Sequence, residues 1–370
     1  MPDRGAGTLG AVPLRYPDPL TPGDRIAITA PSAGVPADLR PRLDFCVQHL
    51  RRRGYDVVLG ECLDGTGVVS APAAARAAEL TVLLTDPSIA AVVPPWGGEL
   101  AVELLPHLDL QALAAAEPTW LVGYSDTSTL LLALTTTTGI ATVHGQNLLD
   151  TPYRVPAPLA SWLDVTALPT GAAFTQGPSS HHRAAGFDSW QDDPTVSDFT
   201  LDTPGTWHLL HDPTHTGTGT DTDSGHPGLE GTLRARGRLI GGCIETVSTL
   251  AGTPFGDLRH FAAEHAPEGL IVYLEAGGEE ATSIARHLWR LRLAGWFKHA
   301  TAVLIGRTRA PDSDGFTQRD AIRSVLGELA VPVVLDVDCG HVPPHLALIN
   351  GALAELTMTT SSTTLTQHLR

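Results

Sequence analysis

The chain has 370 residues, a hydrophobic share of 42%, and 40 acidic against 24 basic side chains, which gives a formal net charge of -16. This length suffices for two domains with their own cores, and the hydrophobic share is ordinary for a globular protein. The negative charge argues against a protein that binds the phosphate backbone of nucleic acids or holds a membrane through a basic patch.

The cysteines and the apolar runs indicate the cellular compartment of the protein. Four cysteines (Cys46, Cys62, Cys243 and Cys339) are scattered without metal-binding spacing, as expected for free thiols in a reducing cytoplasm. No apolar run reaches membrane-spanning length, and residues 1–15 lack the basic and apolar segments of a secretory signal. We therefore predict a cytoplasmic protein with no membrane or nucleic-acid partner and no metal.

In the first half, strand-like and helix-like patterns alternate. Residues 1–20 are rich in proline and glycine and are predicted to be a mobile lead-in. Residues 21–165 are predicted to form a three-layer, mostly parallel α/β domain, because short apolar strands alternate there with helices. Strands are expected at 25–30, 57–59, 90–93 and 121–122, and helices at 39–53, 73–84 and from 99 to 105.

The second half begins with a change of composition. Residues 166–236 are predicted to be a polar linker and insertion, and the low-complexity stretch 211–228 is predicted to be disordered. The histidines and aspartates of that stretch fit no defined metal site. A second α/β domain is predicted over 237–358, followed by a tail, 359–370, that is expected to fray. Its strands are expected at 269–274, 302–305 and 331–335, and its helices at 280–297 and 321–329.

Ser125 is the first candidate for chemistry. It follows the apolar strand ending at Gly123 and precedes an apolar helical stretch, so its hydroxyl is expected to project from a strand-to-helix turn. Backbone N–H groups at such a helix start can bind a developing oxyanion. In a Gly-x-Ser-x-Gly elbow a second glycine follows, whereas Thr127 stands here. The alternative is that Ser125 or Asp126 only caps the helix.

A serine nucleophile needs a base and an orienting acid, and two later strand ends supply candidates. Glu275 ends the strand at 269–274, and His341 follows the strand at 331–335. Singly, each has a plainer alternative, since Glu275 can pair with an arginine or face solvent and His341 can fill a turn.

The Gly97-Gly98 pair also lies at a strand end, where bare backbone amides can approach a substrate oxygen. The alternative is a tight turn into the next helix. The glycine pair belongs to neither a Gly-x-x-x-x-Gly-Lys nor a Gly-x-Gly-x-x-Gly pattern, so a nucleoside triphosphate or dinucleotide fold is unsupported there.

Four separated segments together resemble the LD-carboxypeptidase family of serine peptidases, which includes the microcin C immunity peptidases. The resemblance covers about residues 20–355 and implies a Ser-Glu-His triad of Ser125, Glu275 and His341, with oxyanion-hole amides from Gly98 and Asp126. It also implies a homodimer and a C-terminal α/β domain with a small barrel-like sheet. The segments are 96–99 with 104–109, 123–126 with 143–146, 237–242 with 252–254 and 274–275, and 340–343.

Departures from the family's pattern bear on the substrate. Pro95-Trp96 precedes the glycine pair where the family's carboxypeptidases often have arginine, and Ala276 stands where they often have aspartate. Trp190 and Trp207 resemble the immunity branch, in which an inserted loop stacks tryptophan on a nucleobase. Both tryptophans can equally be small-core anchors. Gly97, Trp190 and Trp207 are thus the candidate substrate-binding residues.

The sequence therefore predicts a cytoplasmic serine hydrolase that works through an acyl-enzyme and needs no metal or organic cofactor. Its predicted substrate is a small molecule or short peptide, with the amide-like bond of an aminoacyl-nucleotide preferred. The alternative substrate is murein tetrapeptide. The alternative from another class is a non-catalytic protein that binds a small molecule at the strand ends.

Overall fold

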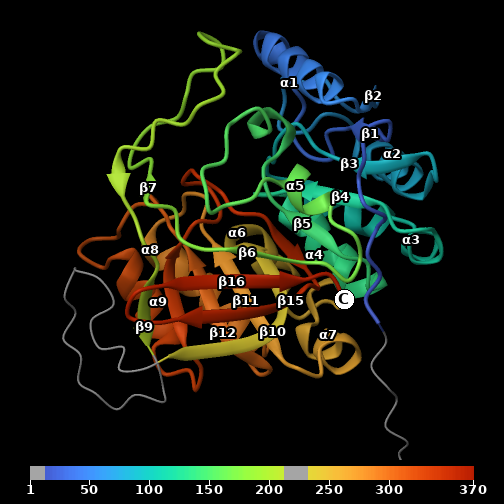
Figure 1. Ribbon diagram of the computed structural model, residues 1–370. Coiled ribbons are helices and arrows are strands. Elements are labelled where there is room, and N and C mark those ends of the chain that lie inside the picture. The colour runs from blue at the N-terminus through green and yellow to red at the C-terminus, as the bar shows by residue number, and fades with distance from the viewer. Residues whose placement is uncertain (1–12, 212–231) are drawn as a thin grey trace, which may run out of the picture.

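The computed structural model describes residues 13–211 and 232–370 and contains two large sheets that lie side by side (Figure 1). Parallel strands, with helices packed against them, occur in both sheets, so the predicted α/β class is confirmed. Within these ranges, no helix is both long enough and apolar enough to cross a membrane.

The N-terminal sheet has six strands in the order β14-β5-β4-β3-β1-β2. Strands β1 to β5 pair in parallel, as the alternation of strands and helices predicts, whereas β14 runs antiparallel at the edge beside β5. The strands are β1 (Arg25–Ile28), β2 (Asp56–Leu59), β3 (Ile89–Val92), β4 (Trp120–Gly123), β5 (Thr142–His144) and β14 (Leu348–Asn350).

Helices cover both faces of this sheet because successive strand residues point to opposite sides. Ile26 and Ile28 of β1 belong to one apolar core, and Ala27 between them belongs to another. The first core includes α1 (Arg40–Arg52) and α5 (Trp162–Thr166), and the second includes α2 (Ala73–Thr85), α3 (Leu110–Ala115) and α4 (Thr127–Thr138). The result is the predicted three-layer arrangement.

The C-terminal sheet has eight strands in the order β6-β16-β15-β10-β11-β12-β13-β9. Strands β10 to β13 are parallel, and the other pairs are antiparallel. Its strands are β6 (Ala173–Gln176), β9 (His208–His211), β10 (Leu233–Cys243), β11 (Leu270–Glu275), β12 (Ala300–Gly306), β13 (Val333–Val337), β15 (Leu353–Met358) and β16 (Thr363–His368). Within the described ranges the two edge strands, β6 and β9, do not pair with each other, so the sheet is open and does not close into a barrel.

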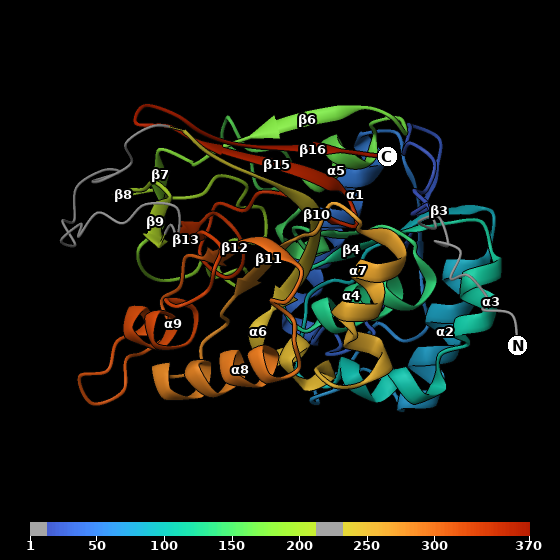
Figure 2. The same cartoon turned by 90° about the horizontal axis from the view of Figure 1, so that it is seen from below.

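Four helices pack against the parallel part of this second sheet. They are α6 (Ile244–Val247), α7 (Leu258–His265), α8 (Ala281–Leu293) and α9 (Gln318–Leu326). Figure 2 shows α8 and α9 below the parallel strands and the β15–β16 hairpin, which continues the same sheet, above them. A short hairpin of β7 (His181–His182) and β8 (Thr203–Pro204) stands apart from both sheets.

Three regions that were expected to lack regular structure are ordered where the structure describes them. The tail, 359–370, contains β16, which pairs with both β15 and β6 instead of fraying. Residues 13–20 of the expected lead-in pack on the N-terminal domain, where Leu20 is only 1% exposed. The predicted linker 166–236 supplies β6 to β9. Of the predicted disordered stretch 211–228, residues 212–228 lie outside the described residues.

Candidate active site

Ser125 lies between the end of β4 and the start of α4, at the turn that the sequence predicts. Its φ of +62° places a residue that has a side chain in the left-handed region, which costs free energy unless the surroundings hold it there. Gly97 packs against this turn so closely that an added Cβ would lie 2.8 Å from the Ser125 Cβ. The turn therefore requires glycine at position 97 and presents the Ser125 hydroxyl beside the glycine pair.

The structure joins Ser125, His341 and Glu275 in one chain of hydrogen bonds. The Ser125 Oγ is 3.1 Å from the His341 Nε2, and the His341 Nδ1 is 2.8 Å from the Glu275 Oε2. Glu275 ends β11, and His341 lies in the loop that follows β13. All three residues thus follow the carboxyl ends of parallel strands, although the strands belong to two different sheets.

Burial and mutual charge act in opposite directions on this acid–base pair. Burial by itself raises the pKa of Glu275, but the His341 charge and hydrogen bond, together with the nearby His144, bring that pKa below its usual range. Burial by itself lowers the pKa of His341, but the Glu275 charge and hydrogen bond raise it above its usual range. The pair therefore favours an ionised acid beside an imidazole of increased basicity.

Several aromatic and titratable side chains that the sequence patterns did not single out surround His341. The Tyr124 ring meets the His341 ring edge to face, with centroids 5.2 Å apart, and its hydroxyl donates to Asp150 at 3.3 Å. Burial raises the pKa of Asp150 to about 6 and lowers the pKa of His345 to about 3.

On the far side of Glu275, the His144 Nε2 is 3.7 Å from the Glu275 Oε1, which is longer than a hydrogen bond. Tyr124 precedes Ser125 and His144 lies in one of the segments that carry the family resemblance, whereas tertiary packing alone brings Asp150 and His345 to the site.

Asp126 ties the glycine loop to the serine turn and does not cap helix α4 with its side chain. Its buried carboxylate accepts hydrogen bonds from the Ser32 hydroxyl at 2.5 Å and from the Ala101 N–H at 2.7 Å. Gly98, with φ +145°, approaches Ser32 so closely that a Cβ there would collide with the Ser32 hydroxyl. Ser32 and Asp126 together fix the loop beside Ser125.

The two candidate stacking tryptophans occupy different environments. Trp207 is fully buried in the C-terminal core, and its indole N–H donates to the Asp338 carboxylate at 2.9 Å. Trp190 is half-buried, donates to the Tyr153 hydroxyl at 3.0 Å, and has the Arg42 guanidinium 5.2 Å from its ring. The structure thus gives Trp207 a packing position and does not bring it to Ser125.

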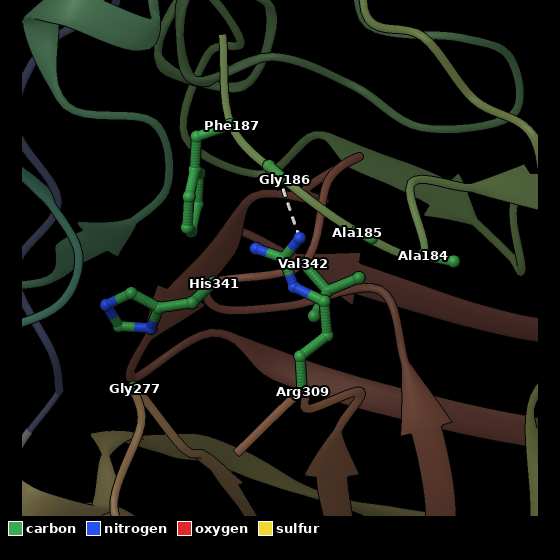
Figure 3. Close-up of a pocket in the computed structure, with 8 residues that line it drawn as sticks. All are labelled: Ala184, Ala185, Gly186, Phe187, Gly277, Arg309, His341 and Val342. Atoms are coloured by element: carbon green, nitrogen blue, oxygen red, sulfur yellow. Dashed lines mark hydrogen bonds between the residues drawn. The ribbon is translucent and has the colours of Figure 1, made fainter. Parts of the chain in front are cut away.

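A pocket of about 410 Å³ opens beside His341, between the segment 184–187 and the strand-end loops (Figure 3). Phe187, which is 73% exposed, and Arg309 both line it. The Arg309 guanidinium lies 4.5 Å from the Phe187 ring centroid and donates to the Gly186 carbonyl at 2.8 Å. An open aromatic face and a cation therefore adjoin the proposed base. The sequence interpretation missed Phe187, although it lies only three residues before Trp190.

The described ranges contain one group of histidine, cysteine and acidic side chains close enough to hold a metal ion. It consists of Cys243, Glu275 and His341, whose ligand atoms lie within 4.8 Å of one another. Two of its members, Glu275 and His341, also belong to the hydrogen-bonded chain from Ser125.

Sequence comparison identifies relatives over most of the chain. A protein of Streptomyces coelicolor, provisionally named a carboxypeptidase, is 31% identical over 359 residues, which are 95% of this chain and 96% of that protein. The microcin C7 self-immunity protein MccF of Escherichia coli is 26% identical and covers 89% of each chain. The murein tetrapeptide carboxypeptidase of Pseudomonas aeruginosa is 27% identical over 90% of this chain and 92% of its own.

Solved structures share the fold at lower identity. An MccF-like protein from Bacillus anthracis superposes with a TM-score of 0.75 at 21% identity, covering 96% of this chain and 99% of its own. MccF in complex with glutamyl sulfamoyl guanosine gives a TM-score of 0.73 at 21% identity, covering 96% and 98%. Residues 26–145 match the LD-carboxypeptidase N-terminal domain, and residues 236–356 match the LD-carboxypeptidase C-terminal domain. The chain therefore belongs to the LD-carboxypeptidase family of serine peptidases.

Proposed function

We propose that the protein hydrolyses an amide or amide-like bond through a covalent acyl-enzyme on Ser125. The observation that carries this proposal is the unbroken hydrogen-bonded chain from Ser125 through His341 to Glu275. A protein that only binds a small molecule has no need of a serine in a strained turn beside a base that is oriented by a buried acid. The geometry thus favours an enzyme over the non-catalytic alternative.

The reaction follows from the positions of the three side chains. His341 accepts the Ser125 hydroxyl proton at Nε2 while Oγ forms a bond to the substrate carbonyl carbon. Glu275 holds the Nδ1–H and stabilises the imidazolium that results. We assign the oxyanion to the backbone N–H groups of Gly98 and Asp126, which the Ser32 and Asp126 side chains hold beside the serine.

The tetrahedral intermediate then loses its leaving group. The carbonyl carbon–nitrogen bond breaks, and the His341 Nε2–H gives its proton to the departing nitrogen. Water enters, His341 removes one of its protons, and the hydroxide oxygen attacks the acyl-Ser125 ester. The acyl product leaves as a carboxylic acid, and Ser125 regains its proton from His341. In this scheme the Ser125 proton leaves on the departing nitrogen and a proton from water replaces it, and no metal or organic cofactor takes part.

For the substrate we prefer an aminoacyl-nucleotide. In support, the pocket beside His341 presents the exposed Phe187 ring, on which a nucleobase can stack, and the Arg309 cation, which can meet a phosphate or sulfamate. The E. coli relative is named for self-immunity to microcin C7, and one of the similar structures holds glutamyl sulfamoyl guanosine. Because Trp207 is buried, we assign stacking to Phe187, with Trp190 as a second candidate.

Murein tetrapeptide is the competing substrate, and Arg309 is the observation that favours it. A guanidinium at the mouth of a pocket can pair with the terminal carboxylate of a peptide as well as with a phosphate. The P. aeruginosa relative is named for that activity.

A hydrolysis screen tests the proposal and separates the two substrates. Wild type and Ser125→Ala are incubated with an aminoacyl-sulfamoyl adenosine and with murein tetrapeptide, and the released nucleoside and D-alanine are measured by mass spectrometry. We expect cleavage of the nucleotide analogue by wild type only. Release of D-alanine without cleavage of the analogue would make murein tetrapeptide the preferred substrate. Cleavage of neither substrate would contradict the proposal that the protein is a hydrolase.

We also propose a cytoplasmic location and a homodimer. All four cysteines are unpaired thiols, which fits a reducing compartment. The homodimer rests on the family resemblance alone. Light scattering during size-exclusion chromatography tests it, and a mass of 39.0 kDa, that of one chain, would contradict it.

A further inference from the structure

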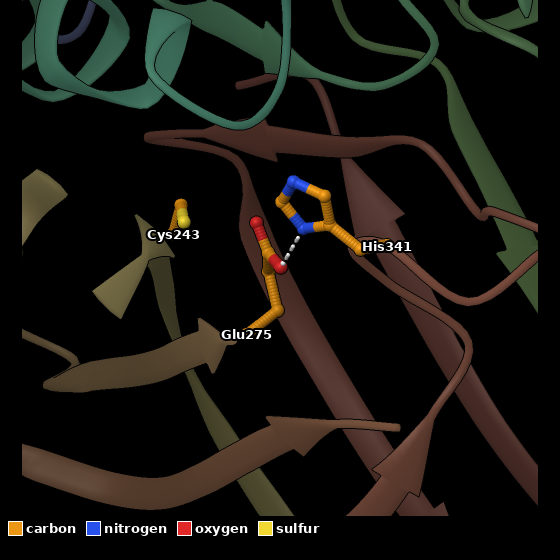
Figure 4. A group of neighbouring side chains, drawn as sticks. All are labelled: Cys243, Glu275 and His341. Carbon is orange, nitrogen blue, oxygen red and sulfur yellow. Dashed lines mark hydrogen bonds and ion pairs between the residues drawn. The ribbon is translucent and has the colours of Figure 1, made fainter. Parts of the chain in front are cut away.

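A cysteine thiol that the proposed reaction does not use lies directly beside its acid and base. Cys243 ends strand β10 and pairs in register with Glu275 at the end of β11. The Cys243 Sγ, a Glu275 carboxylate oxygen and a His341 ring nitrogen lie within 4.8 Å of one another. Figure 4 shows the Cys243 and His341 side chains on either side of the Glu275 carboxylate.

Glu245 brings a second carboxylate to this group. Its Oε1 accepts the backbone N–H groups of Gly277 at 2.8 Å and Gly278 at 3.1 Å, so the carboxylate is fixed in place. Its Oε2 accepts the Cys243 thiol hydrogen at 3.1 Å. A second carboxylate therefore adjoins the sulfur of the group.

This set of donor atoms matches the ligands that Zn²⁺ and similar thiophilic divalent ions use in proteins. A tetrahedral ion with bonds of about 2.0–2.3 Å places its ligand atoms roughly 3.3–3.8 Å apart. The longest separation in the group must therefore shorten by about 1 Å. The His341 side chain is the member that can move, because it is 22% exposed, whereas Glu275 is buried.

The charges of the group also favour a cation. The Glu275 carboxylate lies beside the Cys243 thiol and the Glu245 carboxylate accepts the thiol hydrogen, so negative charge surrounds the sulfur. A divalent ion compensates the carboxylates and takes the sulfur as thiolate, with release of one proton to solvent.

We propose that Cys243, Glu275 and His341, with Glu245 as a fourth ligand, form an inhibitory site for a thiophilic divalent cation such as Zn²⁺. The ion blocks the base through either ring nitrogen. Bound at Nε2, it occupies the position that receives the Ser125 proton. Bound at Nδ1, it displaces the Glu275 hydrogen bond and leaves the proton on Nε2, which then cannot accept another. The inhibition rests on the proposed function, whereas the binding of the metal does not.

Cobalt binding tests the site without any substrate. Co²⁺ is titrated into wild type, Cys243→Ala and Cys243→Ser, and the near-ultraviolet band of a sulfur–cobalt bond is recorded. The matched control is Cys339→Ala, which removes another buried thiol whose pKa Glu275 raises but which lies outside the group. We expect the band in wild type and in the control, its loss in both Cys243 variants, and its displacement by Zn²⁺.

Inhibition is then measured with each variant normalised to its own metal-free rate. The Zn²⁺ concentration for half inhibition should rise at least about tenfold in both Cys243 variants, since even outer partners of a metal site contribute 10–100-fold to affinity. Absence of the sulfur–cobalt band in wild type, or equal Zn²⁺ sensitivity of wild type and both Cys243 variants, would overturn the site. If no substrate is cleaved, the proposed function fails, and the cobalt titration still decides the metal site.

Discussion

Replacing Glu275 by glutamine keeps the shape of the buried side chain and removes its charge. In the wild type this carboxylate lies 2.8 Å from the His341 Nδ1 and is 1% exposed, so no water replaces it when the charge is lost. The amide can also donate to Nδ1 and thereby favour the His341 tautomer with the proton on Nε2. That tautomer cannot take the proton of Ser125, so the base is lost although the fold remains.

We expect kcat to fall by roughly 10³–10⁴-fold, which corresponds to about 4–5.5 kcal/mol of transition-state stabilisation. The pH profile gives a second, independent signature. The rate needs neutral His341, so kcat/KM rises with pH through the His341 pKa, which Glu275 raises in the wild type. Without the Glu275 charge and hydrogen bond the pKa of His341 falls, although the Glu245 and Asp150 charges still raise it, and the acid limb should move to lower pH.

The assay is the pH dependence of kcat/KM for wild type, Glu275→Gln and the control Glu279→Gln. Glu279 lies on the loop after Glu275 but pairs with His287 at 2.9 Å, so its loss should leave the profile unchanged. Thermal melting confirms that each variant is folded. Retention of more than about a tenth of wild-type activity by Glu275→Gln, or an acid limb that stays in place, would refute the assigned role of the acid.

Five further single substitutions and one double variant probe the site and its surroundings. Ser125→Ala and His341→Ala should each lose roughly 10⁴–10⁶-fold in kcat and the double variant no more, since the residues act as a unit; losses that multiply would contradict this. Gly97→Ala should cost about 100-fold or more in kcat, because its Cβ would lie 2.8 Å from the Ser125 Cβ, and unchanged turnover would show that the close approach is unimportant. Phe187→Ala should weaken binding of an aminoacyl-nucleotide analogue by about 1–3 kcal/mol in calorimetry and leave a base-free peptide unaffected; equal losses would exclude stacking. Trp207→Ala should lower the free energy of unfolding in urea by about 3–5 kcal/mol, and a stability loss below about 1 kcal/mol would contradict its packing role.

Local patterns were enough to predict the scaffold of the site. The apolar runs that end at Gly123 and Glu275 form strands β4 and β11, and the apolar run before His341 forms β13. Because parallel strands place their carboxyl ends at one edge, residues after those ends can meet. The distances between Ser125, His341 and Glu275 required the structure, since the strands belong to two sheets whose mutual placement leaves no local pattern.

Pairing between segments far apart in the sequence explains why strands β14 and β16 were not predicted. Strand β14 comes from the C-terminal half but completes the N-terminal sheet, and only three residues carry its pattern. In strand β16 the structure buries Thr363, Leu365 and Gln367 in strict alternation with more exposed neighbours, which is the period of a strand. The threonines of the tail suggest fraying by composition, but their branched side chains suit strands.

One local expectation failed, and one of the two alternatives for Trp207 is favoured, for physical reasons that the structure makes clear. The helix expected from residue 99 is a 3₁₀ helix, Ala101–His107, which contains Pro106, a residue that cannot donate a backbone hydrogen bond. Trp207 lies in a polar segment and yet is buried, because Asp338, 131 residues further along the chain, accepts its indole N–H. A partner so distant in sequence cannot be inferred from composition.

The measurement that tests the central claim most directly is detection of the acyl-enzyme. Wild type is mixed with excess aminoacyl-sulfamoyl adenosine, or with murein tetrapeptide, quenched in acid within milliseconds, digested and mapped by tandem mass spectrometry. The acyl group of the cleaved substrate should be found on Ser125, and it should be absent in Ser125→Ala and strongly reduced in His341→Ala. An acyl group on any other residue, or undiminished turnover by Ser125→Ala, would contradict the proposal that Ser125 is the nucleophile.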